Sequence, residues 1–200
     1  MPELDKMDAD ELLRRYTNGE RDFSGIDLHH CNLYRAELPD INLSHANLVD
    51  VNLCRANLTQ ANLNGANLSD AKLTATNLRQ ANLSNANLVN ANLMLAELGG
   101  ADLKDADLQG ASLWQATLNK ADLMNANLQG VDLSGADLVG TSFVGANLEK
   151  ADMSSANLIA ADLGAACLRD ANLKAANLWN SNLNGATLDN TILPDGHLHY

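Results

Sequence analysis

The sequence contains few aromatic residues, and this scarcity limits the kind of core that it can build. Phe, Trp and Tyr make up 4% of the 200 residues, although 46% of the chain is hydrophobic. Aromatic rings normally fill the large, irregular spaces of a globular core. We therefore expect a core built from small and uniform aliphatic side chains.

Basic residues are also in short supply. The chain has 13 Lys and Arg against 25 Asp and Glu, which gives a net charge of -12. Proteins that bind nucleic acid directly do so through a basic face. The excess of acidic over basic residues argues against a nucleic-acid-binding protein, and we expect no direct nucleic-acid binding.

Several other features are absent from the sequence. No apolar run approaches the roughly 18–20 residues of a membrane span. The acidic start, residues 1–5, lacks the basic and apolar regions of a secretory signal, so we expect a cytoplasmic protein. Cys31, Cys54 and Cys167 are an odd and scattered set, which predicts no disulfide framework.

A five-residue repeat dominates the sequence. From Phe23 to Leu193 every fifth residue is large and apolar, at 35 positions without a change of frame, and only Phe23, Phe143 and Met153 are not Leu. Ala stands two residues earlier at 25 of these positions, and Asn or Asp stands one residue earlier at 26. The consensus is Ala-(Asn/Asp)-Leu-x-x.

This period fits neither a helix nor a flat strand. Five residues of an α-helix advance by about 140° beyond a full turn, so successive leucines would wind around the whole surface. On a strand, an odd period would send them to opposite faces. The pattern predicts a corner after each short extended piece, with Ala and Leu pointing inward and Asn outward. Gly, Asn, Asp and Ser, which are frequent after the leucine, suit such a corner.

The unbroken frame resembles the pentapeptide-repeat family over residues 21–193. The resemblance implies an all-β fold, a right-handed quadrilateral β-helix with four pentads per coil and about nine coils. At roughly 4.8 Å between stacked strands, the rod would be about 42 Å long.

The ends of such a stack need covers, because they expose apolar surface and unpaired edges. Residues 1–20 form a separate N-terminal segment in which 8–19 predict a short helix, with Leu12, Leu13 and Tyr16 lying over the first coil as a structural cap. Residues 194–200 form a C-terminal tail that either folds over the last coil or leaves it for a dimer contact.

The two ends are similar to those of cyanobacterial members of the family. The entry is ELLRRYTNGERDFSGIDL, residues 11–28, and the exit is ILPDGHLHY, residues 192–200. One branch of that group includes regulators of heterocyst differentiation that act through protein contacts. A regulator of cell differentiation is therefore one functional alternative.

Another alternative comes from family members that mimic duplex DNA and bind DNA gyrase. B-DNA carries one charge per roughly 1.7 Å, so a rod of about 42 Å would need about 25 charges. Residues 21–200 hold 19 acidic and 10 basic side chains, well short of that density. With twenty residues per coil, the acids also share their columns with neutral and basic residues.

Metal binding and catalysis are both disfavoured. The run His29-His30-Cys31 has metal-binding residue types, but the frame turns Cys31 inward and places the histidines at a corner. A zinc site needs three or four converging ligands. A tube packed with Leu and Ala leaves no pocket for catalysis, so we expect no enzyme, no metal and no cofactor.

Exposed apolar residues remain as the candidate interaction surface. The fourth position of each pentad should face solvent, and two columns there are apolar. One column holds Met94 and Trp114, with Tyr34 and Cys54 before them. The other holds Val139, Ile159 and Trp179, with Met124 and Val144 on the adjoining face.

The sequence thus predicts a non-enzymatic scaffold for protein–protein interaction. Its partner is an unidentified protein, and no membrane is involved. We expect a monomer, or a weak dimer that forms through the C-terminal end. A purely structural spacer is the remaining alternative.

Overall fold

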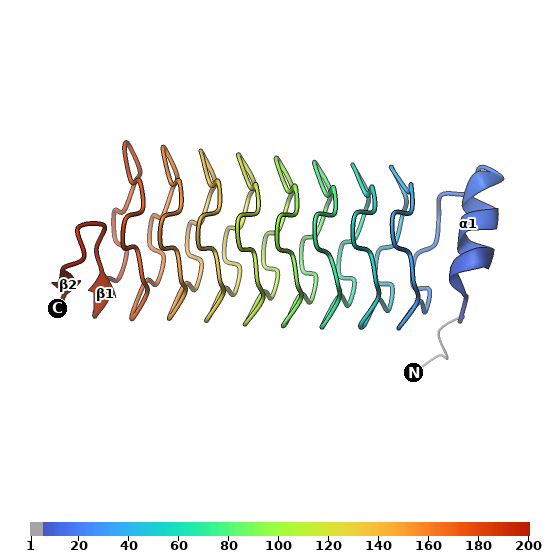
Figure 1. Ribbon diagram of the computed structural model, residues 1–200, viewed down its shortest axis with the longest axis horizontal. Helices are drawn as coiled ribbons and strands as arrows, with labels where there is room; N and C mark the ends of the chain where they lie inside the picture. Colours follow the sequence, from blue (N-terminus) through green and yellow to red (C-terminus); the bar gives the residue numbers. More distant parts are fainter. Residues whose placement is uncertain (1–5) are drawn as a thin grey trace.

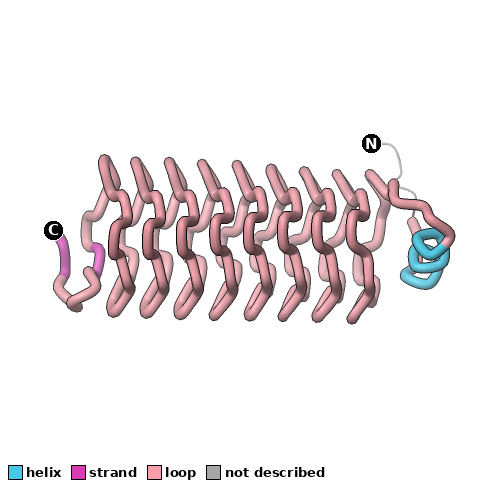
Figure 2. Tube along the Cα trace, turned by 90° about the horizontal axis from the view of Figure 1, so that it is seen from above, coloured by secondary structure: helices cyan, strands magenta, loops and turns pink. Residues whose placement is uncertain are grey.

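The computed structural model describes residues 6–200 as a straight stack of coils (Figure 1). Its named elements are, in chain order, the helix α1 (Ala9–Thr17) and the strands β1 (Thr191–Ile192) and β2 (Leu198–His199). The helix and the strands lie at opposite ends of the stack, as the view from above also shows (Figure 2). The acidic start that argued against a secretory signal lies outside the described residues.

Four pentads make one coil. Parallel bridges join residues that are twenty apart, from Asp22 with Asn42 to Asn172 with Ile192. Backbone hydrogen bonds run to both neighbouring coils. For example, the N–H of Leu63 donates to the carbonyl of Asn82 at 2.7 Å in the next coil, and the N–H of Asn62 donates to the carbonyl of Ile41 at 2.8 Å in the previous one.

The expected all-β character is realised with few regular strands. Each side of a coil pairs with its neighbours through single-residue bridges, because a corner follows before a second residue can join the ladder. Among the described residues only β1 and β2 form a longer pair, and each is two residues long. The extended pieces are therefore shorter than the strands that the fold class suggests.

Left-handed backbone conformations form the corners. The last residue of every pentad from Gly25 to Asn190 has a φ between 50° and 73°. Glycine adopts this conformation without strain, which explains its frequency there. Other residue types occupy it too, including Leu95 (φ 59°) and Ala160 (φ 54°), so the coil geometry overrides the local preference.

The inward residues fill the tube in columns. The central residues from Leu28 to Leu173 are buried, including Phe143 and Met153, and so are the alanines two residues before them. Three threonines replace these alanines at positions 76, 141 and 191 and are also buried. Each hydroxyl donates to a carbonyl 23 residues earlier, as Thr141 does to Leu118 at 2.7 Å. These three buried hydroxyl groups are therefore satisfied.

The N-terminal helix lies against the first coil. The side chain of Asp8 accepts the backbone N–H of Glu11 at 2.8 Å and so begins α1. Leu12 is fully buried, and Leu13 and Tyr16 are partly buried against the core. The Tyr16 hydroxyl donates to the carbonyl of Pro39 at 2.8 Å, which ties the helix to the body of the tube.

The C-terminal tail covers one side of the last coil. It turns after Leu193, and β2 pairs antiparallel with β1. Leu178, Leu183 and Leu188, on the other three sides, are only half-buried, unlike the leucines of the preceding coils. Their backbone N–H groups donate to no described residue, so this end of the tube remains unpaired on three sides.

Candidate interaction surface

The residue before each central leucine has a structural role on the outer surface. Wherever it is Asn or Asp, its side-chain oxygen accepts the backbone N–H two residues later, as Asn92 does from Met94 at 3.1 Å. Asp137 and Asn157 are the exceptions. In these pentads the Asx turn satisfies a backbone donor at the start of the corner, and the sequence pattern alone did not reveal it.

Many of these side chains also bond to the next coil. The amide of Asn62 donates to the side-chain oxygen of Asn42 at 3.0 Å, and Asn127 donates to Asp107 at 2.9 Å. A polar ladder therefore reinforces parts of the backbone ladder along the outside of the tube. The donors of this ladder are Asn amides, and its acceptors include both Asn side chains and carboxylates such as that of Asp107.

The second apolar column lies towards the C-terminal end. Val139 and Ile159 are half-buried, whereas Trp179 in the last coil is 72% exposed. The residues at the adjacent corner, Gly140 and Ala160, are small. We call Val139, Ile159 and Trp179 the apolar edge.

The first apolar column is less exposed. Trp114 is 37% exposed and Met94 is half-buried, while Leu95 beside it is 46% exposed. Val144, on the face adjoining the apolar edge, is half-buried, as is Met124. These side chains lie along the flank of the tube and, apart from Leu95, protrude less than Trp179.

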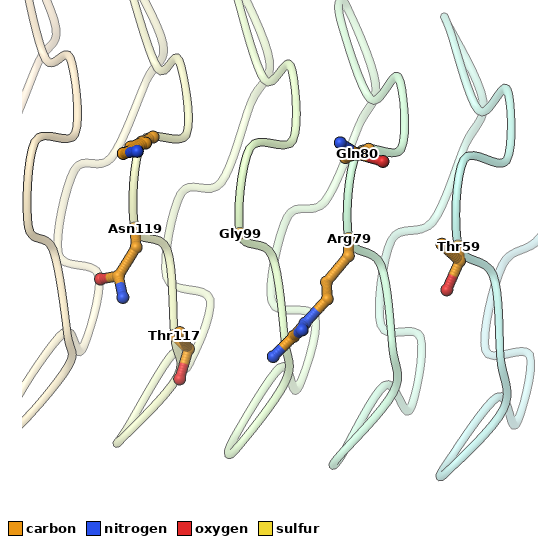
Figure 3. Close-up of a pocket in the computed structure, with 7 residues that line it drawn as sticks. Thr59, Arg79, Gln80, Gly99, Thr117 and Asn119 are labelled. Atoms are coloured by element: carbon orange, nitrogen blue, oxygen red, sulfur yellow. The ribbon is translucent and has the colours of Figure 1, made fainter.

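A polar hollow of about 580 Å³ lies on the same side as the apolar edge, nearer the middle of the rod. Its floor includes Gly99, which has no side chain and lies between Arg79 and Asn119 (Figure 3). The remaining lining residues are Thr59, Gln80, Thr117 and Lys120. Sequence reasoning missed this hollow, although the consecutive glycines at 99 and 100 are its signal.

The histidine and cysteine run does not converge on a common point. His29 contacts Asp27 at 2.7 Å through Nδ1, and His30 contacts Asp50 at 3.0 Å in the next coil. Burial raises the pKa of the Cys31 thiol, which makes it a poor nucleophile at neutral pH. No group of three or more potential metal ligands occurs within residues 6–200.

Acidic side chains are partly neutralised within their columns. Lys104 reaches both Asp102 at 3.4 Å and Asp122 at 2.9 Å. The ammonium of Lys72, 2.9 Å from Asp50, together with His30, holds the pKa of that carboxyl below its ordinary value. The surface therefore lacks an uninterrupted row of free carboxylates at these positions.

No helix in the described part of the chain is long and apolar enough to cross a membrane.

Comparison with known proteins identifies the family to which the repeat corresponds. The family described as pentapeptide repeats matches residues 22–60, 36–74, 61–100, 71–110, 101–138, 126–164 and 166–198. No curated protein matches the chain.

Among solved structures, HetL of the cyanobacterium Nostoc sp. strain PCC 7120 is 32% identical over 96% of this chain and 100% of HetL, with a TM-score of 0.40. It is described as a pentapeptide repeat protein involved in heterocyst differentiation regulation. QnrB1, a plasmid-mediated fluoroquinolone resistance protein, is 21% identical over 84% of this chain and 91% of that one, with a TM-score of 0.75, and shows the fold. Rfr23 of the cyanobacterium Cyanothece 51142 is 41% identical over 46% of this chain and 63% of its own, with a TM-score of 0.45.

Proposed function

Because the chain belongs to the pentapeptide-repeat family, we propose that it is a non-enzymatic scaffold that binds a protein partner through its apolar edge. Proteins of this family adopt a right-handed quadrilateral β-helix and are generally structural or interaction proteins. The outer ladders hold the surface rigid, so little conformational entropy would be lost on binding.

The exposed indole of Trp179 carries this proposal. It is 72% exposed and continues the column of Val139 and Ile159. Tryptophan is enriched among the residues that contribute most to binding energy, and an apolar group rimmed by polar residues is typical of an interface. Asn177 and Asn180 supply such a rim beside Trp179.

A pull-down from the native host, followed by mass spectrometry, tests this edge. We expect Trp179→Ala to lose the partner that the unmodified protein captures. Trp114→Ala is the matched control, because Trp114 is 37% exposed on a different side, and this variant should retain the partner. Retention by the Trp179 variant would place the binding surface elsewhere, and the absence of any specific partner would favour a structural spacer.

A DNA mimic that binds gyrase is the alternative with a different mechanism. The partial neutralisation of Asp102 and Asp122 by the single charge of Lys104 counts against it, because a mimic needs a dense row of free negative charges. A supercoiling assay separates the two functions. Only the mimic should inhibit gyrase at submicromolar protein.

The identity of the partner defines the biological role. The description of HetL supports a regulator of cell differentiation as one such role, since regulation through protein contacts needs the same scaffold. The half-buried leucines of the last coil support a weak dimer through the C-terminal end. A cytoplasmic location stays a prediction of the sequence.

A further inference from the structure

We infer that the hollow around Gly99 binds a carboxylate that an acidic side chain of the protein partner presents. The inference rests on the scaffold function proposed above and adds a second contact to it. Four features of the hollow support it: its space, its backbone donors, its charge and its position.

The space arises from two missing side chains. Gly99 and Gly100 occupy the fourth and fifth positions of one pentad, a combination that no other described pentad has. Arg79 and Gln80 fill these positions in the preceding coil, and Asn119 and Lys120 fill them in the following coil. The hollow therefore opens between these polar side chains, and its lining extends to Thr59 one coil further away (Figure 3).

The backbone supplies unpaired N–H donors beside the hollow. In most pentads an Asx oxygen accepts the N–H of the fourth residue, as Asp162 does from Gly164 at 3.0 Å. Glu97 stands in that place before Gly99, and it pairs with Arg79 at 2.9 Å instead.

Thr117 stands in the same place before Asn119. The N–H groups of Gly99 and Asn119 therefore have no acceptor among the described residues. A carboxylate in the hollow would occupy the place of the missing Asx oxygens and accept these donors.

The charge of the hollow matches one negative group. Lys120 makes no ion pair with any described residue, whereas Arg79 is already paired with Glu97. One uncompensated cation favours the single charge of a carboxylate over the charge of about −2 on a phosphate. Asp137 in the following coil does not line the hollow, and its carboxylate accepts the side-chain amide of Asn157 at 3.1 Å.

The position of the hollow favours a protein as the source of the carboxylate. The column of Arg79, Gly99 and Asn119 continues directly into the apolar edge at Val139. A partner seated on that edge would extend along the same corner. Its acidic side chain would then lie over the hollow, and the two contacts together would fix its direction along the rod.

Amide spectra of the full chain labelled with ¹⁵N-glycine test the inference. The chain has 13 glycines, and the Gly99→Ala variant assigns the signal of Gly99 by its loss. The added Cβ would lie 3.8 Å from the carbonyl of Asn119, an ordinary contact. The probe is acetyl-Gly-Glu-Gly-amide, and the control is the same peptide with Gln.

We expect the Gly99 and Gly100 signals to shift saturably with the Glu peptide and by less than a tenth as much with the Gln peptide. Gly164 is the matched internal control, because it holds the same place in its pentad but its N–H is already bonded to Asp162. Equal shifts with both peptides, or equal shifts at Gly164, would overturn the inference. Saturation by inorganic phosphate alone would identify a free anion as the ligand and overturn it as well.

Variants that restore the missing turn oxygens provide the second readout. Glu97→Asp together with Thr117→Asn, which keeps a negative charge at position 97, should weaken the binding of the Glu peptide at least tenfold, since internal oxygens then occupy the donors. Ser112→Asn makes the same change on another side and should leave binding unchanged. Unaltered binding by the double variant would refute the site. Peptide binding does not depend on Trp179, so failure of the apolar edge in the pull-down remains distinguishable.

Discussion

The side-chain oxygen of Asn87 accepts the backbone N–H of Val89 at 3.1 Å. The same relationship recurs in the pentads that carry Asn or Asp before the central residue, apart from those of Asp137 and Asn157. It gives the outward-facing position of the repeat a specific task. The corner begins with a backbone donor that has no partner in the ladder, and the Asx side chain satisfies it.

Removing one of these turns should lower stability. Asn87→Ala leaves the N–H of Val89 without its acceptor, and we expect a loss of about 1 kcal/mol in the free energy of unfolding. Urea denaturation measures this loss. Ser112→Ala is the control, because Ser112 accepts no hydrogen bond from Trp114, and its effect should be clearly smaller. Equal losses would contradict the role of the turn.

The left-handed corners predict which glycines resist substitution. Gly130 has a φ of 66°, and nothing lies within 4 Å of an added Cβ, so Gly130→Ala tests the backbone conformation alone. We expect a loss of about 1 kcal/mol in unfolding free energy. Gly99→Ala should be nearly neutral, because Gly99 lies outside the left-handed region. Thermal unfolding of the two variants gives the comparison, and a larger loss for Gly99→Ala would be inconsistent with it.

The sequence predicted the tube well because its five-residue pattern reflects the burial of apolar side chains, which is the strongest physical requirement of this fold. A leucine at every fifth residue, with Ala two residues before it, fits a chain that turns after each leucine. The columns from Leu28 to Leu173 are buried accordingly. The bridges between residues twenty apart confirm four pentads per coil. These features repeat many times, so local exceptions such as Thr141 do not obscure them.

The surface was less predictable, because it depends on contacts between residues twenty apart. The hollow at Gly99 requires both the missing side chains of one coil and the side chains of its neighbours. The ion pair of Glu97 with Arg79 is a further contact between coils. It leaves the N–H of Gly99 unpaired. A one-dimensional pattern records the residue types but not these pairings.

We expect α1 to act as a lid on the first coil. Replacing Leu12 and Leu13 with Asp should lower the melting temperature, because Leu12 is fully buried in the core and a charge there would be desolvated. Arg14→Ala is the control, since within residues 6–200 Arg14 forms an ion pair with Glu11 alone, on the same helix. An unchanged melting temperature in the double variant would refute the lid.

The ion pairs of Asp50 predict a dependence of stability on pH. Lys72 and His30 lower the folded-state pKa of Asp50, so its stabilising contribution is present above the unfolded value of about 3.9. The contribution is lost as the pH falls through the lowered folded value. Asp50→Asn should therefore lower the melting temperature at pH 7, and the difference should vanish in strong acid. A difference that persists at pH 2 would show that the charge is not responsible.

The unpaired C-terminal end predicts weak self-association. Two copies could cover the half-buried Leu178, Leu183 and Leu188 of each other. Sedimentation should show a concentration-dependent dimer, and Leu183→Asp should abolish it. Leu95→Asp removes an equally apolar side chain from the middle of the rod, where Leu95 is 46% exposed, and should leave the dimer intact. A monomer at every concentration would disprove the contact.

The spacing of twenty residues between paired coils also governs how the protein tolerates changes in length. Inserting or deleting one whole coil would lengthen or shorten the rod and keep every downstream side chain on its original side. Losing a single pentad between Gly99 and Trp179, by contrast, would rotate everything after it by a quarter turn, so that the two residues would no longer share a corner. The proposed contacts at the apolar edge and the hollow would therefore stay on one side of the rod only if insertions and deletions come in multiples of four repeats.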